Sequence, residues 1–70
     1  MRLDVSWFPR GSGQEGMVEL PPWSRVTDLL DELKETPDGV LVVRDGVPVP
    51  LDTPLSEGDA VRIVRTVSGG

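Results

Sequence analysis

The residues with the clearest chemical potential stand at the end of the chain, where Ser68 is followed by Gly69 and Gly70. A carboxylate is a poor electrophile until one of its oxygens is made a leaving group. Glycine has no side chain, so a tail of two glycines suits threading into the narrow active site of another protein. At an average glycine usage of about 7%, two terminal glycines arise by chance in roughly 0.5% of chains. We therefore expect Gly70 to be the reacting residue, and Gly69 to allow its approach.

The sequence lacks two residue types on which many metal sites and catalytic sites depend. There is no His and no Cys among the 70 residues. Disulfides, zinc sites with thiolate or imidazole ligands, and Cys or Ser–His nucleophilic catalysis are therefore excluded. So short a chain also has little room for an enclosed active site. We expect a protein that other enzymes act on, not an enzyme, with no metal and no bound cofactor of its own.

Two further motifs suggest sites but have simpler explanations. Residues 11–16 match the G-x-G-x-x-G pattern of dinucleotide-binding loops, but such a site requires a helix to begin there, and a short strand and two prolines follow instead. We interpret residues 9–16 as a flexible surface loop, because the segment is rich in Gly and Ser and has no apolar anchor. Four acidic residues are interpreted as the solvated face of a helix, not as a metal or docking site: Asp28, Asp31, Glu32 and Glu35.

The balance of charge bears on partners and location. The formal net charge is −5, which argues against binding to nucleic-acid phosphates or to an anionic membrane surface. It fits a partner with a basic docking surface. The longest apolar run, residues 40–43, is far too short to span a bilayer, and no signal-peptide pattern opens the sequence. We expect a cytoplasmic protein that is a monomer on its own.

Periodic apolar residues predict the elements in the first half of the chain. Residues 2–8 alternate between apolar and polar types, which predicts a half-buried strand with Trp7 in the core, and residues 17–20 predict a second, short strand. A helix follows, with Ser24 as the best N-cap candidate and with residues 37–39 ending it. Its apolar stripe is formed by Val26, Leu29, Leu30 and Leu33.

The second half of the chain predicts three more strands. Residues 40–43 lead into Asp45 and Gly46, a strong hairpin-turn signal, and residues 47–50 return as an edge strand because of their two prolines. Residues 51–59 form a connection that Leu55 anchors in the core. Residues 60–67 predict the last strand, with alternate side chains pointing inward.

This order of elements predicts an α+β fold. One helix can cover one face of a sheet built from two hairpins. Inserting the last strand centrally, parallel to the first, gives a ubiquitin-like β-grasp: a mixed sheet of four to five strands packed on one helix. We expect residues 1–67 to form this domain and residues 68–70 to form a flexible C-terminal tail.

The second half of the sequence also resembles a known family. The hairpin at Asp45 and Gly46, the turn at residues 57–59 before the last strand, and the ending Val67-Ser68-Gly69-Gly70 resemble the prokaryotic ubiquitin-like sulfur carriers and modifiers. These are the ThiS and MoaD families, the tRNA-thiolation carrier TtuB, and the small archaeal modifier proteins. The resemblance extends over nearly the whole chain, and it is most specific from residue 40 to residue 70.

The resemblance implies a reaction that another enzyme carries out on this protein. A ubiquitin-activating-like adenylyltransferase would use ATP to convert the C-terminal carboxylate of Gly70 to an acyl-adenylate. A sulfur donor would then give a thiocarboxylate, for delivery to an acceptor enzyme that sulfurates a thiazole, molybdopterin or tRNA. Alternatively, the activated terminus would be joined to a lysine of a target protein, and the sequence does not separate these two outcomes.

The resemblance also suggests a partner-binding surface next to the tail. By analogy with ubiquitin, Val43, two residues before the hairpin turn, would join Val64 in an apolar patch on the outer face of the sheet. Arg62 on the same strand and the tail residues Val67 and Ser68 complete the predicted surface. Scattered surface apolarity is an equally simple explanation of the valines.

Two other functions stay open at this point. The chain could be the small subunit of a synthase such as molybdopterin synthase, whose larger partner would supply the catalytic residues. It could also be a β-grasp interaction module that only binds partners, in which case the terminal glycines would be incidental.

Overall fold

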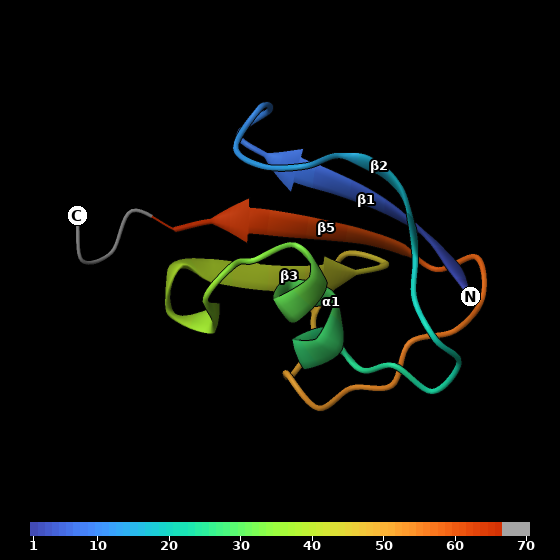
Figure 1. Cartoon of the computed structure of the whole chain (residues 1–70). Coiled ribbons are helices and arrows are strands. Elements are labelled where there is room, and N and C mark those ends of the chain that lie inside the picture. The colour runs from blue at the N-terminus through green and yellow to red at the C-terminus, as the bar shows by residue number, and fades with distance from the viewer. Residues whose placement is uncertain (67–70) are drawn as a thin grey trace.

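This computed structural model describes residues 1–66 of the chain, which form one helix, α1, and a five-stranded sheet (Figure 1). Residues 67–70, and with them the predicted boundary between domain and tail, lie outside the described residues. The elements in chain order are β1 (Arg2–Phe8), β2 (Gly16–Glu19), α1 (Val26–Glu32), the 3₁₀ helix η1 (Pro37–Gly39), β3 (Val40–Arg44), β4 (Val47–Pro48) and β5 (Ala60–Arg65).

The last strand, β5, lies at the centre of the sheet. The strand order is β2-β1-β5-β3-β4, and β5 runs parallel to β1 and antiparallel to β3. Ile63 of β5 therefore lies between Trp7 of β1 and Val42 of β3. The parallel pairing of the first and last strands confirms the β-grasp arrangement predicted from the order of elements. The carboxyl ends of β1 and β5 consequently lie side by side (Figure 1).

The hydrophobic core lies between α1 and one face of the sheet. Alternate residues of β1 and β5 point into it, as their period of two predicts. The predicted stripe of α1 and the predicted anchor Leu55 are buried as well. Burying each such side chain stabilises the folded state by about 1.5–3 kcal/mol relative to leaving it exposed. The core residues, each at most 9% exposed, are Leu3, Val5, Trp7, Val18, Leu20, Val26, Leu29, Leu30, Leu33, Val42, Leu55, Val61 and Ile63.

The start of α1 differs from the prediction. Its N-cap is Arg25, not Ser24. Ser24 is buried, and its hydroxyl donates to the carbonyl oxygen of Pro21 at 2.7 Å, so it closes the turn that precedes the helix. The Asp28 carboxylate accepts a hydrogen bond from the backbone N–H of Arg25 at 2.7 Å, which is one half of a capping box. One of the four predicted solvated acids thus has a structural role.

The helix also ends earlier than predicted. Lys34 adopts φ +60°, and its N–H donates to the carbonyl oxygen of Asp31, while the N–H of Glu35 donates to that of Leu30. These two bonds form a Schellman motif, which satisfies the last helical carbonyls before the η1 segment begins. The sequence did not reveal this end of the helix, because lysine occupies the left-handed position at which glycine usually ends a helix. Within residues 1–66, no helix is long and apolar enough to cross a membrane.

The hairpin of β3 and β4 forms where it was predicted. Asp45 and Gly46 have φ values of +54° and +77°, which a two-residue turn of the hairpin-favouring type requires. β4 is shorter than predicted, although the N–H of Val49 still donates to the carbonyl oxygen of Val42 at 3.0 Å. Its place at the edge of the sheet is confirmed, and Pro48 is tolerated there because no further strand pairs with it.

The loop between β1 and β2 has no apolar anchor of its own, but Trp7 of β1 holds it in place. The indole N–H of Trp7 donates to the carbonyl oxygen of Gln14 at 2.9 Å. A Cβ on Gly13 would collide with the six-membered ring of Trp7, so the loop backbone packs directly on the indole. The buried tryptophan of β1 supplies the anchor that the loop itself lacks. A strand follows the loop, as predicted, so the glycine pattern does not open a helix.

Candidate functional site

The outer face of the sheet, opposite α1, carries those predicted partner-binding residues that the structure describes. On β5, Val61 and Ile63 point into the core, so Arg62 and Val64 lie on the outer face. Val43 lies on the same face of β3, directly opposite Arg62. The three residues therefore share one surface, and their role in binding a partner stays a prediction.

Val64 has two further apolar neighbours on this face. It lies between Phe8 of β1 and Leu41 of β3, two residues along β5 from Arg62, the partner of Val43. Phe8 is 59% exposed and Leu41 is 43% exposed, while Val64 is half-buried. We call Phe8, Val64 and Leu41 the apolar row. It crosses three adjacent strands near the carboxyl end of β5, shortly before residues 67–70.

Sequence reasoning missed two members of the apolar row. It left open which residues of the 40–43 run point outward, because this depends on the register of β3. It did not assign Phe8 to any surface. The alternation provides the missing signal: once Trp7 and Val42 are placed in the core, their neighbours Phe8 and Leu41 must point outward.

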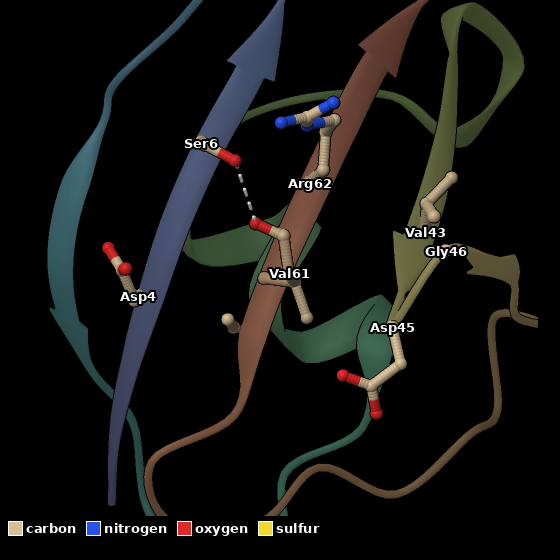
Figure 2. A pocket seen from close by; sticks show the side chains of 8 residues that line it. Asp4, Ser6, Val43, Asp45, Gly46, Val61 and Arg62 are labelled. Atoms are coloured by element: carbon tan, nitrogen blue, oxygen red, sulfur yellow. Dashed lines mark hydrogen bonds between the residues drawn. The ribbon is translucent and has the colours of Figure 1, made fainter.

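A second row crosses the outer face nearer the start of β5. Ser6, Arg62 and Val43 are neighbours on three adjacent strands and border a hollow of about 350 Å³ (Figure 2). In Figure 2, α1 lies behind the sheet, and Asp4 and Asp45 flank the strand that carries Arg62. The lining residues are Asp4, Ser6, Val43, Asp45, Gly46, Ala60, Val61 and Arg62.

The hollow offers charge but lacks a catalytic arrangement. The hydroxyl of Ser6 has only a long contact of 3.5 Å to the carbonyl oxygen of Val61, and the chain has no histidine to serve as its base. No group of three or more possible metal ligands gathers within residues 1–66. An apolar row beside a charged hollow suits recognition of another protein.

Comparison with known proteins shows to which family the chain belongs. Residues 1–67 match the family model of small archaeal modifier protein 2. The chain belongs to this family. A second relative is an uncharacterized protein of Archaeoglobus fulgidus, which is 44% identical to this small archaeal modifier over 46 residues, covering 66% of this chain and 67% of that protein.

Solved structures share the fold of this small archaeal modifier. SAMP1 from Haloferax volcanii superposes with a TM-score of 0.76 at 21% identity, covering 100% of both chains. A protein described as molybdopterin converting factor subunit 1 from Pyrococcus furiosus gives a TM-score of 0.76 at 27% identity, covering 96% of this chain and 99% of that one. A ubiquitin of Caldiarchaeum subterraneum gives 0.71 at 18% identity, covering 100% and 98%. The predicted ubiquitin-like fold is therefore confirmed.

These relatives also bear on the predicted class of protein. The matched family is one of small modifiers, and the solved structures that share the fold include a ubiquitin. Of the predicted site residues of this small archaeal modifier, Val43, Arg62 and Val64 lie on the outer face of the sheet. Val67, Ser68, Gly69 and Gly70 lie outside the described residues.

Proposed function

We propose that this protein is a carrier or modifier that a ubiquitin-activating-like adenylyltransferase activates at the carboxylate of Gly70. A carboxylate oxygen attacks the α-phosphorus of ATP, which forms an acyl-adenylate and releases pyrophosphate. Attack by hydrosulfide from a sulfur donor then releases AMP and leaves a thiocarboxylate. Attack by a lysine amine of a target protein releases AMP and a proton and leaves an amide.

The observation that carries the proposal is the position of the apolar row. β5 is the central strand and, among the described residues, the last one, so the apolar row lies at the end of the strand that precedes residues 67–70 in the sequence. An exposed apolar patch on a small protein marks a surface for another protein. Residues 67–70 follow soon after β5 in the sequence, so an enzyme bound there needs to extend only a few residues along the chain to contact them. Membership of the small archaeal modifier family supports the same conclusion.

The charge of the chain fits an encounter with such an enzyme. A net charge of −5 favours a partner with a basic docking surface and accelerates association at low salt. ATP would be bound by that enzyme, because the hollow described above is open and negatively flanked by Asp4 and Asp45.

ATP–pyrophosphate exchange with the cognate adenylyltransferase tests the proposal. Deleting Gly70 removes the positioned carboxylate, and Gly69→Val adds a branched side chain where bare backbone is needed. A misplacement of about 1 Å can cost on the order of a hundredfold in rate, so we expect exchange to be lost in the deletion and strongly lowered in Gly69→Val. Both changes lie outside residues 1–66, whose side chains supply the described core, so thermal melts should stay unchanged. Full exchange by the deletion variant would make the chain an interaction module instead.

A second candidate is the small subunit of a molybdopterin synthase. The similarity to molybdopterin converting factor subunit 1 of Pyrococcus furiosus over nearly both chains favours it. This function uses the same activated Gly70 but also requires a lasting complex with a larger subunit. Light scattering of the chain mixed with the synthase large subunit of the same organism distinguishes the two. A stable complex supports the synthase, and separate species support a free carrier or modifier.

A further inference from the structure

Arg65 breaks the pattern of the strand to which it belongs. Val61 and Ile63 point into the core, so Arg65 continues the inward-facing side of β5 at its last residue. Its strand partner Val40 also packs against the core. An apolar side chain would follow the alternation at this place. Where a residue departs from such a local rule, a functional reason is a common cause.

The Arg65 guanidinium joins three segments that are distant in sequence. Its Nη2 atom donates to the carbonyl oxygen of Ser12 at 2.7 Å and lies 3.2 Å from both carboxylate oxygens of Glu35. Its Cζ atom lies 4.8 Å from the ring centroid of Trp7. We call Arg65, Ser12, Glu35 and Trp7 the Arg65 clamp. It ties the end of β5 to the β1–β2 loop and to the segment that follows α1.

The clamp completes the anchoring of the β1–β2 loop. Trp7 holds the loop through Gln14 and Gly13, and Arg65 holds it through the carbonyl oxygen of Ser12. The same loop begins directly after Phe8, the exposed member of the apolar row. The contacts of Arg65 on the inner side of the sheet therefore hold the loop that directly follows a residue exposed on the outer side.

Stability alone does not explain the choice of arginine. The side chains of Arg65 and Glu35 are 38% and 21% exposed, and partly exposed ion pairs contribute little to the free energy of unfolding. A planar guanidinium can, however, hydrogen-bond a carbonyl and a carboxylate while it stacks on an aromatic ring; an apolar residue can form none of these polar contacts, and lysine lacks the planar fork that stacks. Arginine therefore suits a position that must hold a loop in one place.

We propose that Arg65 is a positioning residue for C-terminal activation. It fixes the β1–β2 loop against the end of β5, so that the adenylyltransferase meets the loop and the apolar row as one preformed surface. The inference rests on the proposed function. Without the clamp, the loop must be ordered when the enzyme binds, and this cost weakens binding without altering the chemistry at Gly70.

The chain offers a matched control for Arg65 at the other end of the sheet. Arg44 Nη1 donates to the carbonyl oxygen of Pro54 at 3.0 Å and to the Asp59 carboxylate at 3.2 Å. It therefore makes the same kinds of polar contact, but far from the last residues of β5. Arg65→Met and Arg44→Met each remove one such contact set and keep an unbranched side chain. Arg65→Lys keeps the charge and provides a second variant should Arg65→Met fold poorly.

The first measurement is hydrogen exchange by NMR on the free full-length chain. We expect the indole N–H of Trp7 and the backbone N–H of Ser12 to exchange faster in Arg65→Met than in the wild type, and to be unchanged in Arg44→Met. Equal protection in Arg65→Met and the wild type would show that Arg65 does not hold the loop and would overturn the proposal.

The second measurement is ATP–pyrophosphate exchange at varied concentrations of the chain. We expect KM for the chain to rise about three- to tenfold in Arg65→Met, less in Arg65→Lys, with kcat nearly unchanged, because loop ordering adds to the cost of binding. Arg44→Met should keep the wild-type KM. A KM for Arg65→Met within about twofold of wild type, or an equal rise for Arg44→Met, overturns the positioning role. Full activity after deletion of Gly70 would instead refute the proposed function.

Discussion

The glycine at position 13 illustrates how a single residue constrains this fold. Gly13 does not need a left-handed backbone; it needs the absence of a side chain, because the Trp7 ring occupies the space in which a Cβ would lie. The glycine-rich loop therefore packs on the end of the core, although its composition is typical of a mobile segment. Its order depends on Trp7, which lies outside the loop in the sequence.

Gly13→Ala should destabilise the protein through this contact. Overpacking of this kind typically costs about 1–3 kcal/mol, and the free energy of unfolding can be measured by urea denaturation. Gly39→Ala is the matched control, since a Cβ at Gly39 meets nothing within 4 Å. We expect the control to lie within about 0.5 kcal/mol of wild type. Equal stability of Gly13→Ala and wild type would contradict the packing of the loop on Trp7.

At the scale of elements, much of the fold was predictable because the spacing of apolar residues along the sequence reflects which side chains are buried. Strand β1 was predicted with its observed bounds, and the helical stripe, the hairpin turn and the anchor Leu55 were also located correctly. The helix ends were not, since Ser24 and Lys34 act through hydrogen bonds that composition does not reveal. The apolar row was missed because cross-strand neighbours depend on register, which periodicity leaves undetermined.

The helix stripe gives a direct test of the core at this scale. Leu30 is 2% exposed, so Leu30→Ala should lower the free energy of unfolding by about 2–5 kcal/mol through lost contacts and a residual cavity. That is a large share of the stability of so small a domain. Glu32→Ala, on the exposed side of α1, should change it by less than about 0.5 kcal/mol in the same denaturation experiment. Similar losses in the two variants would show that the stripe does not form the core.

At the scale of the whole molecule, the topology places the apolar row and the Arg65 clamp at the same end of the sheet. The central position of β5 puts the apolar row and the Arg65 clamp on opposite sides of the strand that precedes residues 67–70. The two terminal glycines and a family resemblance together predicted activation of the last residue, which stays a prediction. The sequence did not reveal the clamp, because Ser12 and Glu35 lie 53 and 30 residues away from Arg65 in the sequence.

The apolar row should act in docking and not in folding. Leu41→Ser removes a 43% exposed apolar side chain from the row, while Leu51→Ser removes a 45% exposed one from the connection between β4 and β5. Because interface anchors commonly contribute more than 1 kcal/mol, we expect KM in pyrophosphate exchange to rise about fivefold or more for Leu41→Ser. Leu51→Ser should retain the wild-type KM. The docking role is wrong if both variants behave alike.

Hydroxylamine trapping tests the central claim, activation of Gly70, most directly. The full-length chain is incubated with its adenylyltransferase, ATP and hydroxylamine, which attacks an acyl-adenylate, releases AMP and leaves a hydroxamate. Trypsin then cleaves after Arg65, the last basic residue of the sequence, and releases residues 66–70 for fragmentation by mass spectrometry. We predict an ATP-dependent hydroxamate on Gly70 and on no other carboxylate of the chain. An unmodified terminal peptide under conditions in which the adenylyltransferase is active, or a hydroxamate only on Asp or Glu side chains, would contradict the account.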